Sequence, residues 1–359
     1  MSRKPFLYLL AGMLVLGLSG GALAITPKAK VKAAFIYVGP VGDAGWTYAH
    51  DQGRKYLEKT LPYVETAYTE SVAEGDAPRV ISEYARRGYN LIFTTSFGYM
   101  DATLEVAGKF PDVVFMHCSG FKTAPNVGTY FGRMEEAKYL TGLIAGKMAK
   151  KDTLGYVAPH PIPEVIRHVN AFTRGVREIR PTAKVHVVWT NAWYDPARER
   201  EAAESLLDVG ADILSHDQDS PATLQAAAKR GKFAFGYDSD MTQFSPQYHL
   251  TAPIWDWGVL YVQIAKAVHE GTWKNDQLWP GMESGVVLLA PLNPAIPADV
   301  RRLVEEKTKA IKDGKLPVFQ GPVKDQEGKV RVPEGRAATD EEMLSMNYFI
   351  EGVVGKVPK

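Results

Sequence analysis

The stretch that decides the fold reads Gly39-Pro40-Val41-Gly42-Asp43-Ala44-Gly45-Trp46-Thr47-Tyr48. An apolar run over residues 33–38 precedes it, and a helical pattern over 47–60 follows it. A strand that ends in a glycine-rich turn and leads into a helix presents free backbone N–H groups at the carboxyl edge of a sheet, where open α/β folds bind ligands. Asp43 would repel a phosphate group, whereas Trp46 offers a large flat ring. The turn therefore favours a planar, uncharged ligand over a nucleotide tail.

The beginning of the chain predicts export. Arg3 and Lys4 precede an apolar run over residues 6–18, and Ala22-Leu23-Ala24 places small residues where a signal peptidase cleaves. The apolar run is shorter than the roughly 20 residues that a membrane-spanning helix needs. We therefore predict a signal peptide over residues 1–24 and a periplasmic mature protein. No cysteine lies near Ala24, so the sequence does not predict a lipid anchor there.

Charge and cysteine content exclude several classes of function. Arg3 and Lys4 would leave with the signal peptide, which lowers the formal net charge from +1 to −1. This balance provides no basic surface for nucleic acid or for a membrane. Cys118 is the single cysteine, so no disulfide can form within the chain, and we expect it to be a small buried side chain.

The mature chain alternates strand and helix in two series. The first series has short apolar or β-branched runs at 33–38, 63–68, 91–95 and 113–117, and the second has them at 154–158, 185–190, 213–216 and 233–237. Such runs are typical of parallel strands that are covered on both faces. Capping residues and proline mark the starts of helices at Asp195-Pro196 and Ser220-Pro221. The pattern predicts an α/β protein with two doubly wound lobes.

The last third of the chain gives weaker signals. We expect an extended segment at 250–253, a helix over 256–270 that Gly271 ends, and short strands near 285–290 and 318–323. Residues 324–338 are rich in Lys, Glu, Gly and Pro and predict a surface loop, with a final helix over 340–354.

Three motifs resemble the basic-membrane-protein family, whose members are substrate-binding proteins of ABC importers and are similar to the purine nucleoside receptors of bacteria. They are the Gly42-Asp43-Ala44-Gly45-Trp46 turn, the segment Trp193-Tyr194-Asp195-Pro196-Ala197 and the segment from Lys232 to Asp240. The resemblance covers essentially the whole mature chain. It implies a type I periplasmic-binding-protein architecture in which the chain crosses between the lobes three times, near 119–128, 239–253 and 282–291. Lobe 1 would comprise residues 31–120 and 253–285, lobe 2 residues 121–252 and 286–323, and the surface loop and C-terminal helix residues 324–359.

The resemblance also implies a ligand and the residues that stack on it. Family members hold a purine between two aromatic rings, and the matching positions here are Trp46 and Trp193. A purine has apolar faces and a rim of donors and acceptors, so stacking would hold the ring while other side chains select it. Either tryptophan could alternatively belong to the core.

Four further side chains are candidates for reading the purine edge: Asp43, Ser96, Ser119 and Asp238. A carboxylate accepts from an amino group and rejects a carbonyl in the same place. Asp238 matches the sugar-binding acid of the family. For Asp43, Ser96 and Ser119 a role as helix cap or turn residue stays open.

One position departs from the family pattern. The lysine that helps to bind ribose in the family falls at Trp255, whose indole would occupy the space of the sugar. We therefore predict that the protein prefers a free base, adenine first, to a nucleoside. The alternative is that Trp255 lies outside the pocket.

The partners implied by the resemblance are a small purine ligand and an inner-membrane ABC permease, with no cofactor, no metal and a monomeric receptor. An ordinary purine nucleoside receptor is the main alternative. An exported nucleoside hydrolase that uses Asp43, Asp238 and Asp240 is a further one, and a sugar or amino acid could be the cargo of the same fold.

Overall fold

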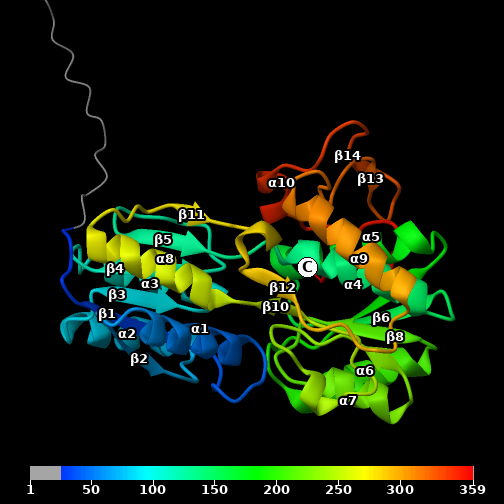
Figure 1. Ribbon diagram of the computed structural model, residues 1–359, viewed down its shortest axis with the longest axis horizontal. Helices are drawn as coiled ribbons and strands as arrows, with labels where there is room; N and C mark the ends of the chain where they lie inside the picture. Colours follow the sequence, from blue (N-terminus) through cyan, green and yellow to red (C-terminus); the bar gives the residue numbers. More distant parts are fainter. Residues whose placement is uncertain (1–25, 359) are drawn as a thin grey trace, which may run out of the picture.

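The computed structural model describes residues 26–358 and places them in two α/β lobes that lie side by side along the long axis of the molecule (Figure 1). The predicted signal peptide, residues 1–24, lies outside the described residues. Within residues 26–358 no helix is long and apolar enough to cross a membrane.

The first lobe is built on a six-stranded parallel sheet with the order β11-β5-β4-β3-β1-β2. Side chains alternate across it, so that Phe35 faces α1 and α8 whereas Ile36 faces α2 and α3. Both faces are thus covered, as the apolar runs predicted. The strands are β1 (Val31–Ile36), β2 (Val64–Thr69), β3 (Leu91–Thr94), β4 (Val114–Cys118), β5 (Val127–Tyr130) and β11 (Gln277–Leu278), and the helices are α1 (Trp46–Thr60), α2 (Ala77–Arg86), α3 (Met100–Ala107) and α8 (Trp257–Glu270).

The second lobe repeats this plan on a five-stranded sheet with the order β15-β7-β6-β8-β9. Tyr156 faces α4 and α5, and its neighbour Val157 faces α6 and α7. The strands are β6 (Thr153–Ala158), β7 (Lys184–Trp189), β8 (Ile213–His216), β9 (Phe233–Ala234) and β15 (Val353–Val354), and the helices are α4 (Met134–Met148), α5 (Pro163–Ile179), α6 (Pro196–Asp208), α7 (Ala222–Lys229) and α9 (Ala298–Lys312).

Helix ends follow the local signals of the sequence. The Asp195 side chain caps α6 by accepting from the backbone N–H groups of Ala197 and Arg198, at 3.2 and 3.1 Å. Gly271 ends α8 in the left-handed conformation, with φ of 71°.

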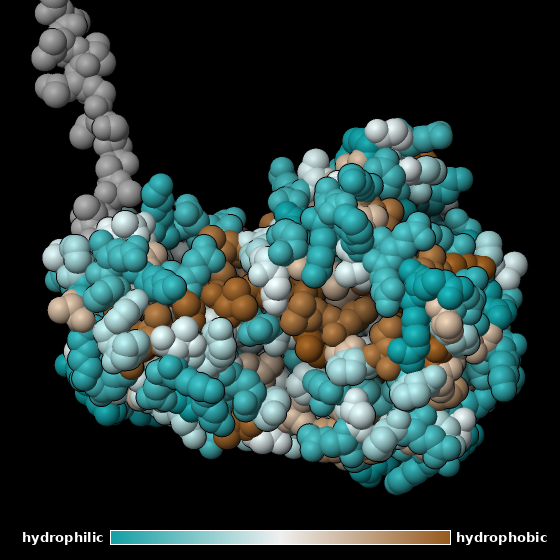
Figure 2. Space-filling view, in the orientation of Figure 1, coloured by the Kyte–Doolittle hydropathy of each residue, from teal (hydrophilic) through white to brown (hydrophobic). Residues whose placement is uncertain are grey.

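The first of the three crossings between the lobes lies later in the chain than expected. The first crossing follows Tyr130, because the buried strand β5 pairs with β4 and still belongs to the first sheet. The boundary expected near residue 120 therefore falls about ten residues too early, since the short run at β5 carries a glycine and no helix separates it from β4. The other two crossings pair as antiparallel strands, β10 (Pro253–Trp255) and β12 (Val287–Leu289). Figure 2 shows apolar side chains between the lobes on the face that carries this pair.

The C-terminal segment differs more strongly from the sequence prediction. The helix expected over 340–354 is limited to α10 (Asp340–Leu344), and β15 then adds a strand to the second sheet. The predicted loop over 324–338 contains an antiparallel pair, β13 (Val323–Lys324) and β14 (Val330–Val332).

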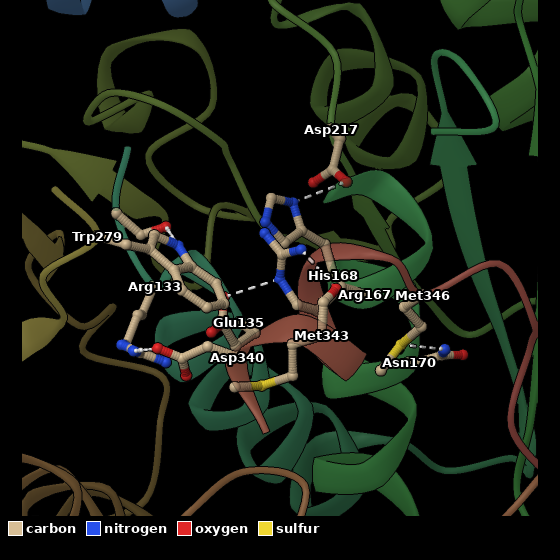
Figure 3. A network of polar contacts seen from close by, with 11 residues as sticks. Arg133, Glu135, Arg167, His168, Asn170, Asp217, Trp279, Asp340, Met343 and Met346 are labelled. Carbon is tan, nitrogen blue, oxygen red and sulfur yellow. Dashed lines mark hydrogen bonds and ion pairs between the residues drawn. The ribbon is translucent and has the colours of Figure 1, made fainter. Parts of the chain in front are cut away.

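Polar contacts connect the C-terminal segment to the first crossing (Figure 3). Arg133 at that crossing forms an ion pair with Asp340 at 2.7 Å and stacks on Trp279. The buried Arg167 donates to Glu135 at 3.1 Å and to the backbone oxygen of Met343 at 3.0 Å. Residues 340–344 therefore support the hinge region from the side of the second lobe.

Candidate functional site

A narrow cavity lies between the lobes, at the carboxyl ends of the strands of both sheets. This is where parallel α/β sheets place their ligands. The first lobe contributes residues that follow β1, β3 and β4, and the second lobe contributes the start of α5 and residues that follow β7, β8 and β9. The lining consists of Val38, Trp46, Thr95, Ser96, Phe97, Ser119, Glu164, Trp193, Asp219, Tyr237 and Asp238.

Trp46 forms part of the wall on the side of the first lobe. It is the first residue of α1, and its indole N–H donates to the backbone oxygen of Thr95 at 2.7 Å. The edges of neighbouring rings pack against it, with centroid distances of 5.8 Å to Trp257 and 6.1 Å to Trp255. The indole plane is thus fixed before any ligand arrives.

Trp193 lies opposite in the second lobe, in the loop between β7 and α6. It is half-buried and tilts against His160, with a centroid distance of 5.2 Å. The structure therefore places the two predicted stacking residues on different lobes of one cavity.

Asp238 lies in the same cavity and is held in a strained conformation. Its φ of +65° is unusual for a non-glycine residue, and Ser119, which also lines the cavity, has the same φ. One carboxylate oxygen, Oδ1, accepts from the indole N–H of Trp255 at 2.7 Å. The other, Oδ2, is buried and has no hydrogen-bond partner among residues 26–358. Burial raises the pKa of Asp238 well above its usual range.

Asp43 acts as a helix cap, the role that the sequence analysis left open as an alternative to ligand binding. Its carboxylate accepts from the backbone N–H groups of Gly45, Thr47 and Tyr48, each at 2.9 Å, and so caps α1. It does not belong to the cavity lining. These three bonds, rather than a purine edge, occupy its oxygens.

Trp255 does not line the cavity. This agrees with the alternative stated in the sequence analysis, that Trp255 lies outside the pocket. Its ring stacks on Trp257 at a centroid distance of 4.5 Å and an interplanar angle of 16°, and packs against Phe131. The expectation that its ring fills the space of a sugar is therefore wrong. Trp255 reaches the cavity through its hydrogen bond to Asp238.

Ser96 and Ser119 both line the cavity, as expected for residues that follow β3 and β4. The Ser96 hydroxyl lies 3.5 Å from Oε1 of Glu74, which is a long contact. Neither side chain caps a helix in the described structure.

Sequence reasoning missed two acids of the site, Glu164 and Asp219. Asp219 follows β8, so its position after a strand could have marked it. Glu164 lies in the first turn of α5, six residues beyond the end of β6, and no local signal distinguishes it. Burial raises the pKa of Glu164 to about 8 and that of Asp219 well above its usual range, and the nearby carboxyls of Asp43 and Asp238 raise the latter further.

The lobes touch directly beside the cavity. A Cβ atom placed on Gly45 would lie 2.3 Å from the backbone oxygen of Asp219, so only glycine fits at this contact. The Ser239 hydroxyl of the second lobe donates to the backbone oxygen of Ala44 at 2.5 Å. The structure is thus a closed form in which the glycine-rich turn docks against the second lobe.

Metal chemistry has no candidate centre in the part of the chain that the structure describes. No three His, Cys, Asp or Glu side chains within residues 26–358 are grouped so that they could hold a metal ion.

Two doubly wound lobes, three crossings and an enclosed interlobe cavity define the class of type I periplasmic binding proteins. Within it, the chain belongs to the Bmp family of ABC transporter substrate-binding proteins, described as PnrA-like, which matches residues 30–319. The resemblance found in the sequence is thereby confirmed.

Individual relatives agree with this assignment. A purine-binding protein of Brucella abortus (strain 2308) is 48% identical over 332 residues, which cover 92% of this chain and 95% of the relative. A putative ABC transporter glucose-binding protein of Haloferax volcanii is 40% identical over 329 residues, covering 91% of this chain and 81% of the relative. The solved structure of an ABC transporter solute-binding protein from Aeropyrum pernix K1 has the same fold, with a TM-score of 0.71 at 19% identity, covering 88% of this chain and 98% of that one.

Proposed function

We propose that this substrate-binding protein captures a purine between its lobes, prefers the free base adenine to a nucleoside, and delivers it to the permease of an ABC importer. The observation that carries this proposal is the presence of Trp46 and Trp193 on opposite lobes of one cavity. A flat ligand that touches both indoles would bridge the lobes and stabilise the closed form, because both contacts exist only after closure. The purine-binding relative from Brucella abortus supports the choice of ligand.

The preference for a base over a nucleoside rests on Asp238. A carboxylate binds the two hydroxyls of a ribose best when both of its oxygens are free to accept. Here the Trp255 indole N–H already occupies Oδ1, which leaves Oδ2 as the single free oxygen. One free acceptor suits an amino group or a ring N–H of a base.

The setting of this function is part of the proposal. Export through the predicted signal peptide would place the mature protein in the periplasm, where a monomer could carry ligand to the inner-membrane permease. No step of this cycle changes the ligand chemically, so we propose a receptor without enzymatic activity.

Calorimetry of the mature protein, unfolded and refolded to remove carried ligand, tests the proposal against adenine, guanine, hypoxanthine, adenosine and ribose. Tight adenine binding with weak adenosine binding is the expected result. Tighter binding of adenosine than of every free base would instead indicate an ordinary purine nucleoside receptor. If no purine binds measurably, the purine assignment is refuted. Glucose would then be the next ligand to test because of the Haloferax volcanii relative. Conversion of adenosine to products would instead identify a hydrolase.

A further inference from the structure

The proposed function gives roles to Trp46, Trp193 and Asp238, but two further carboxyl groups line the cavity. Asp219, from the loop after β8, and Glu164, from the first turn of α5, also line it. Asp219 is 3% exposed, and its backbone N–H is fixed by a 3.1 Å bond to the oxygen of Trp193. The second lobe thus presents three acids to one small enclosed space.

One of these three acids, Asp238, has a carboxylate oxygen without a donor in the described part of the chain. Oδ2 of Asp238 is buried and has no hydrogen-bond partner among residues 26–358, whereas Asp219 and Glu164 have no oxygen among the fully buried, unpaired atoms and Glu164 is half-buried. Leaving this buried acceptor of Asp238 without a donor costs about 1–3 kcal/mol. Burial also raises the pKa of Asp219 and of Glu164, and N–H donors brought by a ligand would stabilise the ionised form of each.

No Lys or Arg belongs to the described lining of the cavity. Two buried cations of the second lobe lie outside this lining: Arg167, whose charge lowers the pKa of Glu164, and Lys138, whose ammonium lies 3.8 Å from the centroid of the Tyr237 ring. Its ammonium group is engaged by Asp217, whose Oδ1 is 2.5 Å away, and by the backbone oxygen of His216 at 2.7 Å. The carboxyls of the cavity therefore share its lining with aromatic rings and hydroxyls but with no cation, and such a lining disfavours an anionic ligand.

We infer that Asp219 and Glu164 determine specificity together with Asp238, and that the ligand is a neutral or cationic base with several N–H donors, such as an amino-substituted purine, rather than an oxo-purine. This inference rests on the proposed purine-binding function. An amino group donates to a carboxylate, whereas a carbonyl at the same place can accept only from a protonated carboxyl group, so discrimination against oxo-purines should increase as pH rises toward the Glu164 pKa of about 8. 2,6-Diaminopurine and adenine should bind more tightly than hypoxanthine, and xanthine, which loses a proton near neutral pH, should bind most weakly.

The test compares these four purines by calorimetry in the mature wild-type protein and in the variants Asp219→Asn and Glu164→Gln. An amide can donate to a carbonyl, so each variant should lower the ratio of adenine affinity to hypoxanthine affinity, by about tenfold for Asp219→Asn. Asp240→Asn is the matched control, because Asp240 is exposed and outside the cavity, and it should leave the ratio unchanged.

The outcomes separate this inference from the proposed function. If purines bind but the ratio stays within twofold of wild type in both substituted proteins, Asp219 and Glu164 do not select the ligand and the inference is wrong. Tighter binding of xanthine than of adenine by the wild type would also overturn it. If the wild type binds no purine, the proposed function fails first. If Asp219→Asn does not fold, as judged by circular dichroism, the ratio of adenine affinity to hypoxanthine affinity in Glu164→Gln decides whether the inference holds.

Discussion

Gly45 of the first lobe lies directly against the backbone of Asp219 of the second lobe. A Cβ atom at Gly45 would be 2.3 Å from the oxygen and 2.5 Å from the Cα of Asp219. Because backbone atoms cannot move aside as a flexible side chain does, the glycine sets how far the cleft can close. The turn that marked the site in the sequence is therefore also the contact that completes closure.

Replacing Gly45 with alanine should hold the cleft partly open and weaken ligand binding by at least about tenfold, or ~1.4 kcal/mol. The folded lobes should be unaffected, because Gly45 meets the other lobe rather than its own core. Gly42→Ala is the control, since a Cβ atom at Gly42 meets nothing within 4 Å. Calorimetry with adenine measures both variants, and equal affinities for the two would contradict this role of Gly45.

Trp193→Ala should weaken purine binding by at least about tenfold, because it removes one stacking surface and its apolar area. The variant should still fold, since Trp193 is half-buried and lies in a loop. Tyr194→Ala serves as control, because Tyr194 is 44% exposed and outside the cavity lining. Unchanged affinity in Trp193→Ala would remove this residue from the site.

Trp255→Phe should raise the affinity for adenosine relative to adenine. Phenylalanine retains much of the stacking on Trp257 but donates no hydrogen bond, so both oxygens of Asp238 become available to a ribose. A net hydrogen bond is worth about 0.5–1.5 kcal/mol, which corresponds to a change in the affinity ratio of roughly twofold to tenfold.

Trp257→Phe is the matched control for that experiment. It removes a similar volume from the same stacked pair, but the Trp257 indole N–H has no hydrogen-bond partner among the residues described. If both variants shift the ratio of adenosine to adenine affinity equally, the hydrogen bond to Asp238 is not the cause.

The stability of the ligand-free protein should depend on pH through Glu164. Burial raises its pKa from 4.5 to about 8, so the folded protein keeps a proton that the unfolded chain loses. This contribution is absent below pH 4.5, and it lowers the free energy of unfolding progressively as pH rises from 4.5 to about 8. Urea unfolding across this range should show Glu164→Gln gaining stability over wild type as pH rises. A difference that does not change with pH would contradict the assignment.

Arg167→Ala should lower the free energy of unfolding by about 3–5 kcal/mol, because it leaves the buried Glu135 carboxylate without its cation. Asp340→Ala breaks the more exposed pair with Arg133 and should cost at most about 1 kcal/mol. Figure 3 shows the two pairs close together, so urea unfolding of both variants compares buried and exposed pairs in one network. Similar losses in both would refute this distinction.

The alternation of strands and helices, and the site at the strand ends, could be predicted from the sequence. These features depend on the period of apolar residues and on caps such as Asp195, which act within a few residues of the chain. The family resemblance then placed Trp46 and Trp193 on opposite sides of one ligand. The missed or shortened elements, β5 and α10, are short, and pairing with distant strands or packing against α5 defines them more than local pattern does.

The sequence by itself determined the two-lobed α/β class and the aromatic character of the site, because both follow from local periodicity and motifs. Only the tertiary structure decided which acids meet in the cavity. The Asp43 carboxylate accepts hydrogen bonds from the backbone at the start of α1, whereas Asp219 and Glu164 line the cavity from distant parts of the chain. It also decided that Trp255 acts through Asp238 rather than by filling space. Such relationships depend on strand pairing and lobe closure across long sequence separations, which no local pattern encodes.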